Sequence, residues 1–201
     1  MADTVIYVHG RGGSAAEAEL YRPLFPACEV IGFDYRAQTP WEAKDEFPAL
    51  FAPFYEKSGR VFLIANSIGA FFSLHALDAE RIEKAFLISP VADMAALVAG
   101  MMARAGVTED ALYEKRTVVT ADGETLSWEY LEYVRAHPLE WRAPTEILYG
   151  ERDALTSLET MRAFAGRIGA RLTVMPNGEH WFHTPEQMRF LREWLLRVKG
   201  S

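Results

Sequence analysis

Residues Val61 to Gly69 read Val-Phe-Leu-Ile-Ala-Asn-Ser-Ile-Gly, and they give the strongest indication of the fold. Its consecutive apolar residues predict a strand that is buried on both faces, as in a parallel sheet. Ser67 follows this strand, with the small residues Ala65 and Gly69 two positions to either side. A sharp turn from a strand into a helix needs small flanks and lifts the central hydroxyl out of the sheet edge. The stretch therefore predicts a serine nucleophile at the carboxyl end of a buried strand.

Other short apolar runs alternate with helical patterns along the chain. The runs that we expect to form strands are Thr4–Val8, Val30–Phe33, Arg60–Ala65, Ala85–Ser89, Glu146–Tyr149 and Arg171–Met175. Capping patterns beginning at Thr39, Thr156 and Thr184 mark the starts of intervening helices. This alternation predicts an α/β fold with a doubly wound, mainly parallel sheet of six strands.

Residues 92–141 interrupt the alternation, because they contain no strand–helix unit between the fourth and fifth expected strands. Their pattern predicts helical stretches and a hairpin around the turn Asp122-Gly123. We expect an insertion that forms a cap or lid within a single domain, with residues 1–91 and 142–201 as the core. The alternative is that this segment only covers sheet surface.

Composition narrows the class of partner and the cellular location. Half of the 201 residues are hydrophobic and the formal net charge is −7, which argues against nucleic acid or an anionic membrane as a partner. No apolar stretch approaches the roughly 20 residues of a membrane span, and no signal peptide is expected. Cys28 is the single cysteine, so we expect no disulfides, no cysteine-based metal site and a cytoplasmic location.

A serine hydroxyl is a weak nucleophile and needs an imidazole to take its proton and a carboxylate to orient that imidazole. Asp153 follows the fifth expected strand and His180 follows the sixth. Because parallel strands end at one edge of the sheet, both side chains are expected beside Ser67. Asp93 is the substitute candidate for the acid and His183 for the base.

These residues give the chain a resemblance to the α/β-hydrolase family over nearly its full length outside the insertion. Ser67, Asp153 and His180 follow the Ser…Asp…His order of that family. The run His9–Gly13 (His-Gly-Arg-Gly-Gly) resembles its oxyanion loop. The resemblance implies strand order 2-1-3-4-5-6 and oxyanion donors at the backbone N–H groups of Arg11 and Ile68. Two departures are that Ala65 replaces the usual first glycine of the motif and that no antiparallel hairpin precedes the first strand.

The resemblance implies a serine hydrolase that cleaves a small-molecule carboxylic ester or thioester through an acyl-enzyme. An amidase or peptidase using the same triad and a non-catalytic, ligand-binding homologue are the alternatives within this fold. Trp128, Met101 and Trp181 are apolar candidates for substrate binding. No metal or organic cofactor is expected, and the sequence predicts no oligomeric state.

A dinucleotide-binding protein is the alternative from another class. Gly10-Arg11-Gly12, continuing to Ala15, fits Gly-x-Gly-x-x-Ala after the first strand, and Asp34 ends the second. This interpretation leaves the three residues at the later strand ends, Ser67, Asp153 and His180, without a role.

Overall fold

The computed structural model describes residues 1–200, which form two compact units. The first unit comprises Met1–Ala92 and the residues from Glu140 onward, and the second comprises Asp93–Leu139. The predicted sheet and every residue of the predicted Ser, His and Asp set belong to the first unit.

The first unit is built on a six-stranded sheet in which every neighbouring pair of strands is parallel. Its strands are β1 Asp3–Val8, β2 Cys28–Phe33, β3 Val61–Asn66, β4 Lys84–Ile88, β7 Thr145–Gly150 and β8 Arg171–Met175. The order β2-β1-β3-β4-β7-β8 is the predicted order 2-1-3-4-5-6 when strands are numbered within the sheet. The predicted α/β fold is therefore confirmed, and each strand lies within two residues of its expected limits.

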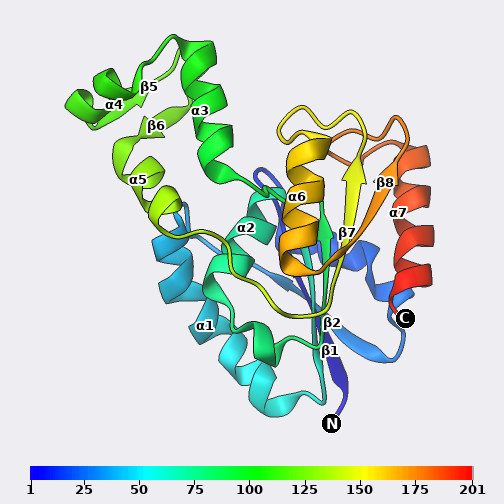
Figure 1. Cartoon of the computed structure of the whole chain (residues 1–201). Helices are drawn as coiled ribbons and strands as arrows, with labels where there is room; N and C mark the ends of the chain where they lie inside the picture. The colour runs from blue at the N-terminus through cyan, green and yellow to red at the C-terminus, as the bar shows by residue number, and fades with distance from the viewer. Residues whose placement is uncertain (201) are drawn as a thin grey trace. The chain divides into compact units, whose positions relative to one another are not determined.

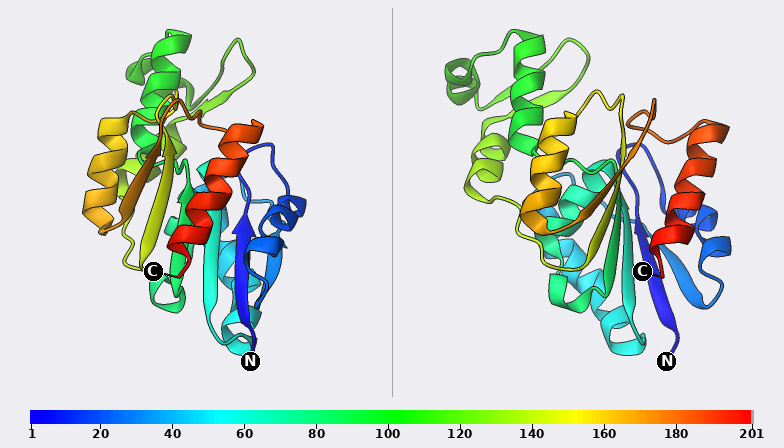
Figure 2. Two further views of the ribbon diagram at one scale, coloured as in Figure 1. Left: turned by 90° about the vertical axis from the view of Figure 1, so that its right-hand side faces the viewer. Right: turned by 45° about the vertical axis from the view of Figure 1, so that its right-hand side comes forward.

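Helices cover both faces of this sheet (Figure 1; Figure 2). The face that carries α7 (Pro185–Val198) also carries two short 3-10 helices, Ala15–Leu20 and Arg22–Leu24. The opposite face carries α1 (Pro40–Lys57), α2 (Ser67–Ala76) and α6 (Leu158–Ile168), and a third 3-10 helix, Ala79–Arg81, precedes β4.

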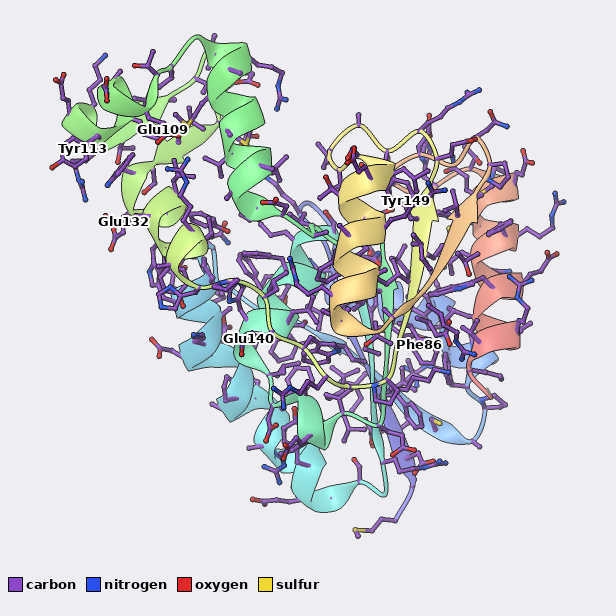
Figure 3. All side chains as sticks on the ribbon, viewed as in Figure 1. Phe86, Glu109, Tyr113, Glu132, Glu140 and Tyr149 are labelled. Atoms are coloured by element: carbon purple, nitrogen blue, oxygen red, sulfur yellow. The ribbon has the colours of Figure 1, made fainter. Side chains whose placement is uncertain are left out.

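The core on the α7 face is an aromatic and aliphatic layer between the strands and that helix. Trp194 is fully buried there and packs edge-to-face on Phe86 of β4, with ring centroids 6.4 Å apart (Figure 3). The ring of Phe25 also packs against Phe86, with ring centroids 6.1 Å apart. Burying side chains of this size contributes about 1.5–3 kcal/mol each and fixes α7 against the sheet.

Helix starts follow the predicted capping residues at two of three places. Thr39 accepts a hydrogen bond from the Glu42 amide at 3.3 Å, and Thr184 caps α7 in the same way. The prediction that Thr156 caps α6 is wrong by one residue, because Ser157 accepts from the Thr160 amide at 3.1 Å. Thr156 is instead buried in the preceding loop, where its amide is bonded to a carboxylate.

The second unit consists of three helices and a hairpin, the kinds of element that its sequence predicts. They are α3 Met94–Ala105, α4 Glu109–Lys115, β5 Thr117–Val119, β6 Thr125–Ser127 and α5 Trp128–Ala136. Leu112, Leu126 and Leu131 are buried, while Tyr113 is exposed (Figure 3). That this unit acts as a cap stays a prediction.

Neither a membrane span nor a metal cluster is found in residues 1–200. None of the helices there combines the length and the apolar character that a bilayer crossing requires. Within the same residues, no three His, Cys, Asp or Glu side chains converge as metal ligands would.

Candidate active site

Three side chains from three strand ends form one hydrogen-bonded chain. The Ser67 hydroxyl lies 2.8 Å from His180 Nε2, and His180 Nδ1 lies 2.7 Å from Asp153 Oδ2. The Asp153 side chain is fully buried, whereas that of His180 is 20% exposed. In this arrangement the imidazole can take a proton from the hydroxyl while the carboxylate holds it in the required tautomer.

The turn at Ser67 is strained and tightly packed. Ser67 is the first residue of α2 and has a φ of 49°, a left-handed conformation that is uncommon for residues other than glycine. Gly69 passes so close to β1 that an added Cβ would lie 2.1 Å from the carbonyl oxygen of His9. Ala65, at the position where the family motif has glycine, is fully buried at the end of β3. Its methyl group is therefore compatible with the turn.

The loop after β1 lies directly against this turn. A Cβ on Gly10 would lie 3.2 Å from the Cβ of Ser67. Gly10 and Gly13 close a β-turn through a 3.1 Å bond, and Gly12 has a φ of 74°, which the third position of a type II turn requires. The hydrogen bond that closes this turn is donated by the Gly13 N–H group and does not involve the N–H group of Arg11.

The second predicted oxyanion donor, the Ile68 N–H group, belongs to the first turn of α2. The first N–H groups of a helix have no acceptor within it and are available to a ligand. Gly10 and Ser67 lie close together, and Arg11 and Ile68 are the residues that follow them in the chain. Their role as oxyanion donors stays a prediction.

The buried carboxylate of Asp153 uses both of its oxygens. Oδ1 accepts from the amides of Leu155 and Thr156 at 2.8 and 3.2 Å, and Oδ2 faces His180. Tyr149 of β7 stabilises the same loop, because its hydroxyl donates a hydrogen bond to the Thr156 carbonyl at 2.7 Å. The loop therefore fixes the orientation of the carboxylate before any substrate arrives.

The loops that carry Asp153 and His180 are joined to each other. The Arg152 amide donates to the Gly178 carbonyl at 2.7 Å, and its guanidinium donates to the Asn177 side chain at 2.6 Å. The backbone N–H group of Asn177 donates to the Glu151 carboxylate at 2.9 Å. A Cβ on Gly150 would lie 2.6 Å from the carbonyl oxygen of Gly178, so this approach needs glycine.

The two substitute candidates have other contacts. Asp93 caps α3 in the second unit and accepts from the Ala96 amide at 2.8 Å. The ring nitrogen Nδ1 of His183 lies 2.7 Å from the Trp181 carbonyl and 3.6 Å from the Glu179 carboxylate. The hydrogen bond to Ser67 therefore comes from His180 and not from His183, and the bond to His180 comes from Asp153 and not from Asp93.

The three candidate substrate-binding residues are divided between the units. Trp181 belongs to the first unit, is 72% exposed and stacks on the ring of His183 with centroids 4.5 Å apart. Trp128 and Met101 belong to the second unit, where the Trp128 ring packs edge-on against Tyr113. Their binding roles stay predictions.

The dinucleotide interpretation is not supported by the loop after β1. The glycine turn leads into the short 3-10 helix Ala15–Leu20 and not into a regular helix that could direct its amino terminus at a pyrophosphate. The carboxylate of Glu17 also occupies this loop and accepts from the Ser14 amide at 3.3 Å.

Sequence reasoning missed a polar network behind the nucleophile. The Asn66 side-chain amide donates to the Tyr7 hydroxyl at 3.0 Å, and that hydroxyl donates to Glu17. The available signals were a tyrosine within an apolar strand and the capping pattern from Ser14 to Glu17. Neither signal indicates that the two residues meet.

Comparisons with known proteins agree with this architecture. No family model matches the chain. Est1E from Butyrivibrio proteoclasticus superposes with a TM-score of 0.76 at 16% identity, covering 100% of this chain and 89% of that one. Alpha/beta hydrolase domain-containing protein 10 from mouse gives 0.76 at 19% identity, covering 98% of this chain and 90% of that one.

A curated relative also matches in sequence. It is "Putative esterase/lipase 3" of Mycoplasma genitalium, 29% identical over 103 residues. The match covers 44% of this chain and 36% of the relative, so it spans well under two thirds of that protein's length. The strand order, the turn at Ser67 and the structural neighbours together show that this chain has the α/β-hydrolase fold.

Proposed function

We propose that the protein is a serine hydrolase that cleaves carboxylic esters or thioesters through an acyl-enzyme on Ser67. The observation that carries the proposal is the hydrogen-bonded chain from Ser67 through His180 to the buried Asp153. Similarity to an esterase/lipase relative and to α/β-hydrolase structures supports ester bonds as the substrate class.

In the first half-reaction the Ser67 oxygen attacks the carbonyl carbon while His180 Nε2 takes the hydroxyl proton. Asp153 stabilises the imidazolium that forms. The amides of Arg11 and Ile68 hold the negative oxygen of the tetrahedral intermediate, and one such donor is worth about 3 kcal/mol of barrier. The intermediate then collapses, and the alcohol or thiol leaves with the proton from His180.

In the second half-reaction a water molecule takes the place of the leaving group. His180 removes its proton as the water oxygen attacks the acyl carbonyl of the Ser67 ester. Collapse of the second intermediate returns the proton to Ser67 and releases the carboxylic acid. The net reaction consumes one water and one ester and needs no further reactant.

The test is covalent labelling with a fluorophosphonate probe. We expect wild-type protein to be labelled and Ser67→Ala to remain unlabelled. Ser73→Ala is the matched control, because this serine lies in the same helix and its hydroxyl only donates to the Gly69 carbonyl at 2.7 Å. Absence of labelling in folded wild-type protein would overturn the proposal, as would equal labelling of Ser67→Ala.

Substrate panels then resolve the bond that is cleaved. Acyl esters and thioesters of rising chain length are compared with anilides of the same acids. We expect the ester or thioester series to be hydrolysed; hydrolysis of anilides alone would assign an amidase. Binding of a nicotinamide dinucleotide by protein that the probe does not label would favour the dinucleotide class instead.

A further inference from the structure

A partly buried chain of hydrogen bonds lies next to Ser67 and is not used in the proposed chemistry. It begins at Asn66, the last residue of β3 and the neighbour of Ser67. The Asn66 amide donates to the Tyr7 hydroxyl on β1, and this hydroxyl donates to Glu17 beyond the loop. The chain therefore links the strand that carries the nucleophile to the segment that follows the candidate oxyanion loop.

The direction of these bonds follows from the surroundings of Tyr7. This side chain is fully buried, and its ring packs against Tyr21 with centroids 5.0 Å apart. Burial, together with the neighbouring Tyr21 and Glu17, raises the pKa of the Tyr7 hydroxyl far above its usual range. The hydroxyl therefore stays protonated and donates its hydrogen bond to Glu17, and its oxygen accepts a hydrogen bond from Asn66.

Glu17 connects the chain to the loop itself. One carboxylate oxygen accepts from Tyr7, and the other accepts from the Ser14 amide at 3.3 Å. The same oxygen lies so close to Gly13 that a Cβ there would be 2.9 Å away. The carboxylate thus holds the end of the β-turn that contains Arg11.

Asn66 connects the chain to the nucleophile. Its side-chain amide donates a hydrogen bond to the Tyr7 hydroxyl. The next residue in the chain, Ser67, has the strained left-handed conformation. The Oδ1 atom of Asn66 is buried and accepts no hydrogen bond from residues 1–200. A half-satisfied buried amide costs about 1–3 kcal/mol, and this side chain is oriented by its bond to Tyr7 together with its interaction with Tyr21.

We propose that Glu17, Tyr7 and Asn66 are positioning residues that set the distance between the two oxyanion donors, the amides of Arg11 and Ile68. The inference rests on the proposed function. Oxyanion stabilisation depends on donors that are aimed in advance, and a misplacement of about 1 Å can cost on the order of 100-fold in rate. None of the three residues touches the substrate in this scheme.

The test compares Tyr7→Phe and Glu17→Gln with wild type on the best ester substrate. We expect each variant to lower kcat about 10- to 100-fold, with KM changed less than about 3-fold. The midpoint of the pH–rate profile should stay in place, because the bonds among Ser67, His180 and Asp153 are not part of the network. The double variant should be no slower than the slower single variant, since both break one network.

Two control variants separate positioning from general stability. Glu42→Gln makes the same change in the capping box of α1, where no tyrosine hydroxyl is bonded to the carboxylate. Tyr55→Phe removes a buried hydroxyl that has no hydrogen-bond partner in residues 1–200. We expect both controls to keep the wild-type kcat.

Unchanged kcat in folded Tyr7→Phe and Glu17→Gln would overturn the inference. Losses that only follow a lowered thermal midpoint, or that appear equally in Glu42→Gln, would overturn it as well. Failure of the proposed function would be seen separately, as wild-type protein whose Ser67 does not react with the probe.

Discussion

The two halves of the candidate site are held together by different means. The nucleophile half, at the ends of β1 and β3, is joined through the fully buried Tyr7, which links the partly buried side chains of Asn66 and Glu17. The acid–base half, at the ends of β7 and β8, is joined by the Asp153–His180 bond itself, by a main-chain bond from Arg152 to Gly178 and by the exposed side chains of Arg152 and Asn177.

The difference follows from the position of each half in the sheet. β1 and β3 are interior strands with neighbours on both sides, whereas the acid–base half combines the interior strand β7, which carries the buried acid, with the edge strand β8. Loops at interior strands are surrounded by packed chain, so polar groups there must find buried partners. Loops near an edge can use solvent-exposed partners. We therefore expect the acid–base half to tolerate side-chain changes at its surface and to be sensitive to changes in its backbone or in the buried acid.

The largest effect is expected at the buried acid. Asp153→Asn should lower kcat about 10⁴-fold, because an amide stabilises the wrong imidazole tautomer while keeping the shape of the side chain. Asp93→Asn is the matched control and should keep the wild-type kcat, since that carboxylate only caps α3. Steady-state kinetics on one ester measure both. If Asp93→Asn alone were inactive, the acid would be misassigned.

An intermediate effect is expected where the two acid–base loops touch. Gly150→Ala places a methyl group 2.4 Å from the carbonyl oxygen of Glu179 and should lower the free energy of unfolding by about 1–3 kcal/mol. Gly166→Ala, in α6 with open space around its Cβ, should raise it by about 0.5–1 kcal/mol. Urea unfolding followed by circular dichroism compares the two. Equal stability of both variants would contradict the close approach of the loops.

The smallest effect is expected for the exposed pair in the same half. Arg152→Ala and Asn177→Ala each remove the 2.6 Å side-chain bond but keep the main-chain bond from residue 152 to Gly178. Exposed polar pairs contribute about 0–1 kcal/mol, so we expect kcat to fall less than about 3-fold in either variant. A double-mutant cycle measures the coupling. A loss as large as that of Tyr7→Phe would remove the contrast between the halves.

The sequence was sufficient for the fold and for the proximity of Ser67, His180 and Asp153, because the signals for both are local. Each strand is a run of apolar residues, and Ser67, Asp153 and His180 each follow such a run directly. Parallel strands then bring those positions to one edge without any knowledge of side-chain packing.

The network around Tyr7 could not be predicted because its members are ordinary in their own neighbourhoods. Tyr7 fits a buried strand and Glu17 fits a capping box, and only the pairing of β1 with β3 places Asn66 beside them. The same limit applies to Lys84 and Glu146, two buried charges on neighbouring strands whose N···O distance is 3.4 Å. The error at Thr156 has a related cause, since the Asp153 carboxylate takes the Thr156 amide and leaves Ser157 to begin α6.

The abrupt start of α2 at Ser67 has an electrostatic consequence. Aligned peptide dipoles give the amino terminus of a helix an effective charge of about +0.5, which stabilises a nearby anion by about 0.3–1 kcal/mol. Since Ser67 is the first residue of the ten-residue helix Ser67–Ala76, the positive end of the helix lies at its hydroxyl. The turn that presents the nucleophile thus also sets a favourable field for the negative charge that its attack would create.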